Sequence, residues 1–186
     1  MSTENINPWK TLKSEQVHES PWIRVTKHDV LNPAGNPGTY STIHFKNLAI
    51  GVVPLDKNYN TWLVGQYRYP IEQYSWEIPE GGGNLNIDPI DSAKRELKEE
   101  TGIIASKWTK IQEMYLSNSA SDEFCILFLA QDLKFEKSEP EDTELLEVRK
   151  VPFEAVYQMV LNGEITDSLT VTAALKVKLM MLEGKI

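Results

Sequence analysis

The segment from Gly81 to Ile103 constrains the fold more than any other part of the chain, because it predicts a short helix with both ends defined. Asp88 can cap the helix N-terminus and Pro89 suits the first helical position. Gly102 suits the left-handed position just past the helix end. Apolar residues recur at helical spacing and predict one buried face: Ile90, Ala93 and Leu97.

Three carboxylates occupy one face at the end of this predicted helix. Glu96, Glu99 and Glu100 are spaced i, i+3, i+4, and like charges at that spacing repel one another. Mg²⁺ prefers oxygen ligands and is usually held by a few carboxylates together with substrate phosphates. The alternative is a solvated acidic face with ion pairs to the neighbouring lysine and arginine side chains.

The same segment resembles the signature of the Nudix hydrolases. That signature is Gly, five residues, Glu, seven residues, then Arg-Glu-aliphatic-x-Glu-Glu-x-Gly-aliphatic. The matching positions are Gly81, Arg95, Glu96, Leu97, Glu99, Glu100, Gly102 and Ile103. One position departs from the pattern, since Ile87 stands where the signature has its first Glu. This departure removes the loop contacts of that Glu but leaves the helical carboxylates in place.

Within the family, the chain is similar to the branch of ADP-ribose and nucleoside-diphosphate-sugar pyrophosphatases. The similarity rests on N-terminal strands ahead of the core, on residues 66–70, on residues 76–82, and on residues 144–152 followed by two helices. It implies an α+β fold, a Nudix-type α/β/α sandwich with a mixed sheet and an N-terminal antiparallel β extension. The expected division is 1–45, the extension that dimerises, and 46–186, the Nudix domain. In this branch the N-terminal strands commonly join a homodimer.

Hydrophobic alternation and turn-forming residues place the remaining elements. We expect residues 22–31 and 40–45 to form one antiparallel pair of strands, and residues 49–55 and 61–67 to form a second. A tight glycine turn at 81–83 should precede the acidic helix. Further strands are expected at 107–115, 124–133 and 146–151, and closing helices at 153–162 and 168–182.

The resemblance implies Mg²⁺-dependent hydrolysis of the diphosphate bond of ADP-ribose or a related nucleoside diphosphate sugar. The products would be a nucleoside monophosphate and a sugar phosphate, and Mn²⁺ is the alternative ion. The expected metal ligands are Glu96, Glu99, Glu100 and the backbone carbonyl of Glu80. The expected catalytic carboxylates are Glu99, Asp142 and Glu144, with Glu141 as an alternative in the same acidic loop.

Substrate contacts are expected from Arg68, Glu77 and Trp22. Arg68 could grip a phosphate or the distal ribose, and Glu77 could bind sugar hydroxyls. The alternative for both is a structural ion pair between strand ends. Trp22, or else Tyr40 or Tyr67, could stack on the base, although aromatic residues on strands more often belong to a core.

A second functional class stays open, a non-catalytic Nudix-fold module that binds a nucleotide. Ile87 favours this hypothesis, whereas three mutually repelling carboxylates argue against it, because a module that only binds need not keep them. House-cleaning of oxidised nucleoside triphosphates is disfavoured by the N-terminal extension and the C-terminal stretch.

Charge and composition limit which partners the protein is expected to bind and in which compartment it is expected to lie. The net charge of −8 argues against nonspecific binding of nucleic acid or of an anionic membrane. It does not prevent polyphosphate binding, since a metal can invert the local charge. Cys125 is the single cysteine and lies in an apolar run, which suggests a buried residue in a reducing compartment. We see no signal peptide and no membrane-spanning run, so we expect a cytoplasmic location.

Overall fold

The computed structural model describes residues 6–137 and 146–186. The chain divides into two compact units, Met1–Asn47 with Tyr115–Glu123, and Leu48–Met114 with Phe124–Ile186. Within the described residues, no helix is long and apolar enough to cross a membrane.

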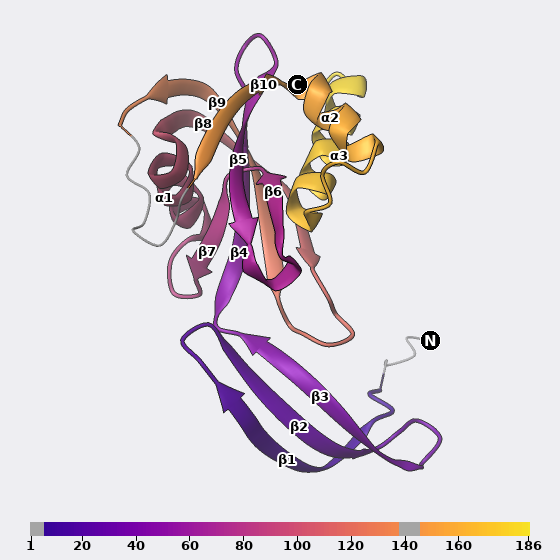
Figure 1. Cartoon of the computed structure of the whole chain (residues 1–186). Helices are drawn as coiled ribbons and strands as arrows, with labels where there is room; N and C mark the ends of the chain where they lie inside the picture. Colours follow the sequence, from indigo (N-terminus) through magenta and orange to yellow (C-terminus); the bar gives the residue numbers. More distant parts are fainter. Residues whose placement is uncertain (1–5, 138–145) are drawn as a thin grey trace. The chain divides into compact units, whose positions relative to one another are not determined.

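The N-terminal unit is built on a three-stranded antiparallel sheet of order β1-β2-β3 (Figure 1). The strands are β1 (Lys10–Glu19), β2 (Ile23–Leu31) and β3 (Pro37–Phe45). The pairing of β2 with β3 confirms the first expected strand pair. The sequence did not predict β1 as a separate strand, because all of its side chains are exposed and its residues show no continuous apolar face.

The segment Tyr115–Glu123 is attached to β3 of the same unit. Ile43 donates its backbone N–H to Ala120 and accepts one from Asp122. The Asp122 carboxylate accepts the N–H of Phe45 at 2.8 Å and pairs with the His44 ring. Residues 115–123 therefore belong to the N-terminal unit, although they lie far along the chain. A single division of the chain after residue 45 does not include them in that unit.

The second unit contains two sheets between helical layers (Figure 1). One sheet has the order β7-β4-β9-β8, in which β4 and β9 run parallel, and the other has the antiparallel order β10-β5-β6. The strands are β4 (Asn47–Pro54), β5 (Asn60–Arg68), β6 (Gln73–Glu77), β7 (Glu80–Asn84), β8 (Ile103–Tyr115), β9 (Phe124–Phe135) and β10 (Glu147–Pro152), with the short 3-10 helix η1 (Tyr69–Ile71) between β5 and β6.

The expected pairing of residues 49–55 with 61–67 is wrong. These segments are β4 and β5, which are consecutive but belong to different sheets. β4 pairs with β7 and β9, so its hydrogen bonds are used within its own sheet. Asp56 accepts the N–H groups of Asn58 and Asn60 and shapes the turn that leads from one sheet to the other.

The expected glycine turn is also wrong, because Gly81 and Gly83 lie in the strand β7. The turn comes afterwards, where the N–H of Ile87 bonds to the carbonyl of Asn84. Gly83 permits close packing in the strand, since an added Cβ there would lie 2.8 Å from Cγ1 of Ile50.

The acidic helix is α1 (Pro89–Thr101), and its predicted ends are confirmed. The Asp88 side chain accepts the N–H of Ile90, and Gly102 has φ +70°. In Figure 1, α1 covers one side of the sheets, and α2 (Phe153–Leu161) and α3 (Ser168–Leu182) cover the other. This arrangement confirms the predicted α/β/α sandwich with an N-terminal antiparallel extension.

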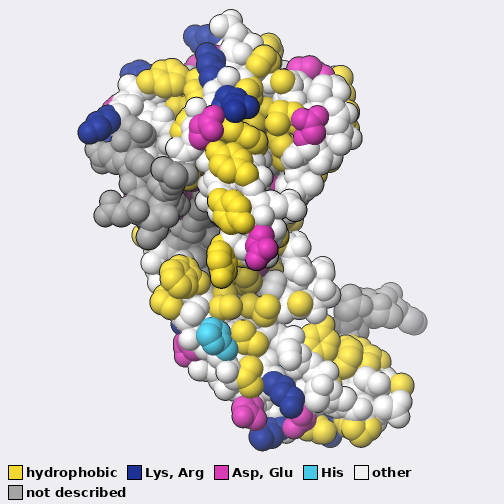
Figure 2. Space-filling view, viewed as in Figure 1, with side chains coloured by type: hydrophobic (Ala, Val, Ile, Leu, Met, Phe, Trp, Pro, Cys, Tyr) yellow, Lys and Arg dark blue, Asp and Glu magenta, His cyan; other side chains and the backbone are white. Residues whose placement is uncertain are grey.

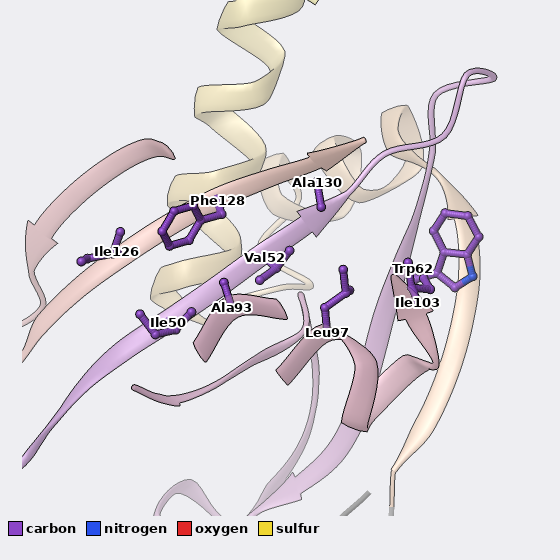
Figure 3. Close-up of a cluster of buried hydrophobic side chains, with 9 residues drawn as sticks. All are labelled: Ile50, Val52, Trp62, Ala93, Leu97, Ile103, Ile126, Phe128 and Ala130. Atoms are coloured by element: carbon purple, nitrogen blue, oxygen red, sulfur yellow. The ribbon is translucent and has the colours of Figure 1, made fainter. Parts of the chain in front are cut away.

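The buried face of α1 packs on both sheets. Ala93 and Leu97 are fully buried and Ile90 is partly buried against the same cluster, which confirms the apolar stripe predicted for this helix. Figure 3 shows the hydrophobic cluster in which they lie, and its other buried members are Ile50, Val52, Trp62, Ile103, Ile126, Phe128 and Ala130. This core fixes the rotation of α1 and therefore fixes where its carboxylates point.

Candidate active site

Two carboxylates of α1 are buried on the side of the helix that meets β7. Glu96 is 8% exposed and Glu100 is 3% exposed. The third, Glu99, is more open, with 31% of its side chain exposed. Burial of ionised carboxylates is costly unless cations or hydrogen-bond donors compensate them, so these positions require partners.

The backbone of β7 supplies close contacts to both buried carboxylates. The N–H of Glu80 donates to the Glu100 carboxylate at 3.1 Å. An added Cβ on Gly81 would lie 2.5 Å from both carboxylate oxygens of Glu96. The absence of a side chain at Gly81 therefore creates the space in which the Glu96 carboxylate rests against the strand.

Arg95 bonds to two of the three α1 carboxylates and to the backbone of β7. Its guanidinium donates to Glu99 at 2.6 Å, to Glu96 at 2.5 Å and to the carbonyl of Gly82 at 2.9 Å. Burial would lower the pKa of Arg95, but the charges of Glu96 and Glu99 raise it above its ordinary value. Arg95 thus stays charged and links α1 to β7.

A second acidic cluster lies beside the first and contains Glu77, Glu80 and Asp167. One carboxylate oxygen from each lies within 4.8 Å of the others. Arg68 bonds to this cluster, with 2.5 Å to Glu77 and 2.8 Å to Glu80. Burial alone would lower the pKa of Arg68, but hydrogen bonding and charge from Glu77, with the charge of Glu80, raise it.

The pKa of the Glu80 carboxyl is raised well above its usual range. Burial is the first cause of its raised pKa, and the charges of Asp167 and Glu77 add to it. Its Oε2 atom is buried and meets no hydrogen-bond donor among the described residues.

The N-terminus of α3 joins this network through two residues that the sequence reading missed. Asp167 caps α3 by accepting the N–H of Thr170 at 2.7 Å. The Thr170 hydroxyl donates to Asp167 at 2.8 Å and accepts the N–H of Ile78 at 2.9 Å. The run Asp-Ser-Leu-Thr could have indicated a helix cap, but no sequence signal indicated its contact with residues 78–80.

The structure brings together six of the predicted site residues, which are Arg68, Glu77, Glu80, Glu96, Glu99 and Glu100. Asp142, Glu144 and Glu141 lie outside the described residues.

The remaining candidates have other surroundings. Trp22 is 68% exposed and belongs to the N-terminal unit. In the same unit, the Tyr40 hydroxyl donates to the carbonyl of Ser119, and the Tyr40 ring meets Trp9 edge-on. Tyr67 is exposed on β5, and Ile87 is half exposed in the turn before α1.

The donor set of α1 and β7 fits a hard divalent cation. It contains carboxylate oxygens from Glu96, Glu99 and Glu100, beside the backbone of a strand that carries no side chain at Gly81. The space at Gly81 lets carboxylate and backbone approach more closely than any other residue would permit. Arg95 contributes the orienting contacts that such ligands commonly require.

Comparisons with known proteins match nearly the whole chain. A family model described as the nucleoside diphosphate sugar hydrolase N-terminal domain matches residues 9–43, and one described as the NUDIX domain matches residues 45–171. The chain is 33% identical over 166 residues to the ADP-ribose pyrophosphatase of Bacillus subtilis (strain 168), covering 88% of this chain and 89% of that one.

Two further matches agree with these. An ADP-ribose pyrophosphatase of Mycobacterium tuberculosis is 30% identical over 174 residues, which is 91% of this chain and 83% of that one. The crystal structure of an ADP compounds hydrolase superposes with a TM-score of 0.85, covering 99% of this chain and 100% of that one at 22% identity. At that identity the structural match establishes the fold.

Proposed function

The chain belongs to the Nudix hydrolases, and from that premise we propose that it cleaves the diphosphate bond of ADP-ribose or a related nucleoside diphosphate sugar with the help of Mg²⁺. The family uses divalent metals, and Mn²⁺ is the alternative ion. Water would attack one phosphorus atom of the diphosphate, and the products would be a nucleoside monophosphate and a sugar phosphate.

One observation carries this proposal, the contact of two buried carboxylates with the backbone of β7. Glu96 rests on Gly81, and Glu100 accepts the N–H of Glu80. Like charges on one helix face, two of them buried, favour a site that receives a cation. A hydrophobic or solvated helix face would need neither the buried carboxylates nor the missing side chain.

The roles of the residues follow from what diphosphate hydrolysis demands. Bound Mg²⁺ would neutralise the phosphate oxygens and lower the pKa of the attacking water. Glu96, Glu100 and the carbonyl of Glu80 would hold it, and Glu99 would serve either as a further ligand or in proton transfer. We also propose Asp142 and Glu144 as catalytic carboxylates, on the resemblance alone. Arg95 would keep the Glu96 and Glu99 carboxylates oriented, since it bonds to both.

Arg68, Glu77 and Trp22 are our candidates for substrate binding. Arg68 is bonded to Glu77 and Glu80, so it would meet a phosphate or ribose only with the part of its side chain that is exposed, 36% in all. Glu77 is 3% exposed on its side chain and would contact the sugar only after a rearrangement of that pair. Trp22, which is widely exposed, remains the candidate for stacking on the base.

We further propose a homodimer built on the N-terminal sheet. Val30 is the only buried hydrophobic side chain among residues 6–47 and 115–123. Figure 2 shows hydrophobic side chains on the surface of this unit. The exposed hydrophobic side chains include Trp9, Leu12, Val17 and Trp22. A small sheet with so little buried apolar area needs another surface to cover it.

A cytoplasmic location agrees with the cysteine content. Cys125 is the single cysteine and is buried, so the chain contains no pair of cysteines that could form a disulfide. This composition is ordinary in a reducing compartment.

A substrate panel tests the proposed activity. The protein would be incubated with ADP-ribose, GDP-mannose, a dinucleotide and a nucleoside triphosphate, each with Mg²⁺ and with EDTA, and the products separated by chromatography. We expect Mg²⁺-dependent release of a nucleoside monophosphate from the sugar nucleotides. Release of phosphate or diphosphate from the triphosphate alone would contradict the substrate class.

The alternative, a non-catalytic module that binds a nucleotide, rests on Ile87. Nucleotide binding without turnover of any member of the panel would favour it. In that event, Ile87→Glu should produce a large gain in turnover from a baseline near zero, whereas an already competent enzyme should change only modestly.

A further inference from the structure

We propose that Thr170 and Asp167, at the N-terminus of α3, are positioning residues for the metal site. They would fix residues 78–80, so that the backbone of Glu80 faces the Glu96 and Glu100 carboxylates. The proposal rests on the metal site described under the proposed function, and it assigns a role to a helix on the other side of the sheets from α1.

The contact between α3 and residues 78–80 is made by one hydroxyl group with a defined orientation. Thr170 is 0% exposed, so its hydroxyl has no access to water. That hydroxyl donates to Asp167 at 2.8 Å and accepts the N–H of Ile78 at 2.9 Å. Because the proton points to Asp167, a lone pair is left for Ile78, and Asp167 thereby sets the orientation of the hydroxyl.

Three neighbouring residues are each held by a different element. The N–H of Ile78 bonds to Thr170 of α3, the carbonyl of Pro79 accepts from Val52 of β4 at 2.8 Å, and the N–H of Glu80 bonds to Glu100 of α1. The bond from Ile78 holds the peptide plane between Glu77 and Ile78, and the other two bonds hold the plane between Pro79 and Glu80. Loss of the bond from Ile78 would release the first of these planes, which lies three peptide units before the expected ligand carbonyl of Glu80.

Such a release should affect metal binding more than it affects the fold. Mg²⁺ demands a nearly ideal octahedral arrangement of ligands, so small displacements of a ligand reduce affinity. Partners that orient ligands typically change metal affinity by about 10–100-fold when they are mutated. Ordinary helix capping requires only the bond from the Thr170 N–H to Asp167, and the second bond from Ile78 reaches across 92 residues of sequence.

The test compares Thr170→Val with a matched change at Thr61. Thr170→Val removes the hydroxyl at nearly constant volume, and Thr170→Ser keeps it. Thr61 is also buried, at 1% exposure, but its hydroxyl has no partner among the described residues. Thr61→Val therefore controls for the loss of a buried threonine hydroxyl without loss of an anchoring bond.

Binding of Mn²⁺ alone would be measured by titration calorimetry, and the melting temperature would be measured in EDTA. We expect Thr170→Val to bind Mn²⁺ about tenfold more weakly than the wild type, with Thr170→Ser and Thr61→Val close to the wild type. The proposal would be overturned if Thr170→Val bound Mn²⁺ with wild-type affinity, or if Thr61→Val lost as much Mn²⁺ affinity as Thr170→Val.

Asp167→Ala provides a second variant in case Thr170→Val does not fold. It leaves the Thr170 hydroxyl in place but releases its orientation, so the proposal expects weaker Mn²⁺ binding here also. If Asp167→Ala bound Mn²⁺ more weakly while Thr170→Val bound it as the wild type does, Asp167 would be a metal ligand and the positioning role would be overturned. A wild-type protein that binds no Mn²⁺ would refute the metal site itself, a different failure from a Thr170→Val variant with wild-type affinity.

Discussion

Gly81→Ala is a change for which the structure predicts loss of activity with little loss of stability. The added Cβ would lie 2.5 Å from both carboxylate oxygens of Glu96, whereas ordinary van der Waals contact begins at 3.4 Å. The carboxylate carbon Cδ would lie closer still, at 2.3 Å, so the carboxylate must move by about 1.1 Å to reach ordinary contact. A displacement of about 1 Å at a reacting site can cost about 100-fold in rate, or about 2.7 kcal/mol.

The stability cost should be small, because the obstructing atoms are the end of a flexible side chain. A shift of Glu96 to a strained rotamer costs about 0.5–1.5 kcal/mol. For a protein of this size, that corresponds to a fall of roughly 1–6 °C in melting temperature. The assay is therefore kcat at saturating Mg²⁺ together with a thermal melt in EDTA.

Two other glycines supply matched controls. Gly83→Ala in the same strand would place its Cβ 2.8 Å from Cγ1 of Ile50, so it should lower stability through the core instead of displacing Glu96. Gly38→Ala has no heavy atom within 4 Å and should be neutral. If Gly81→Ala kept more than half of the wild-type kcat, the Glu96 carboxylate would not be needed where the structure has it.

Other changes test separate parts of the account. Arg68→Ala removes the cationic partner of the buried Glu77 and leaves it only the hydrogen bond from Gln66. The change should cost about 2–3 kcal/mol, less than for a fully buried pair because the Arg68 side chain is 36% exposed. Denaturant unfolding measures this cost, and full stability of the variant would contradict it. Burial would raise the pKa of Asp56, but hydrogen bonds from Lys150 and Asn60 hold that pKa well below its usual range. The stabilisation by Asp56 is thus present above about pH 4 and is lost as the pH falls further. Asp56→Ala should destabilise the protein by about 1–3 kcal/mol at pH 7 and by less at pH 3. As a control, Asp91→Ala changes an exposed carboxylate and should be nearly neutral at both pH values. An equal effect of Asp56→Ala at the two pH values would refute the reasoning. Deletion of residues 1–45 should abolish dimerisation and weaken substrate binding, and a fully active wild-type monomer in sedimentation at micromolar concentration would refute the dimer.

The sequence predicted α1 and its carboxylates because the relevant signals are local. Asp88, Gly102 and the apolar spacing act within one helix, and the structure has each of them as predicted. The arrangement of the strands depends on distant partners. β4 pairs in parallel with β9, more than 70 positions further along the chain, and no feature of the turn at Asp56 indicated that β5 would join another sheet.

The same contrast explains what was missed in the site. The glycines of β7 were interpreted as a turn because glycine is typical of turns, whereas Gly81 is needed for the approach of a side chain from α1. Asp167 and Thr170 meet Ile78 only after α3 packs on the sheets. Arg68 and Glu77 were expected to contact substrate, with an ion pair as the alternative, and the structure contains that ion pair.

The central claim is that Glu96 and Glu100 hold a divalent cation for diphosphate hydrolysis, and Glu100→Gln tests it most directly. This change keeps the size of the side chain and removes its charge. We predict that the wild type converts ADP-ribose to AMP and ribose 5-phosphate only with Mg²⁺, and that Glu100→Gln lowers kcat/KM by about 100-fold or more. Its melting temperature in EDTA should be unchanged or slightly higher, because repulsion is relieved. A Glu100→Gln variant with near wild-type turnover at saturating Mg²⁺ would contradict the metal assignment.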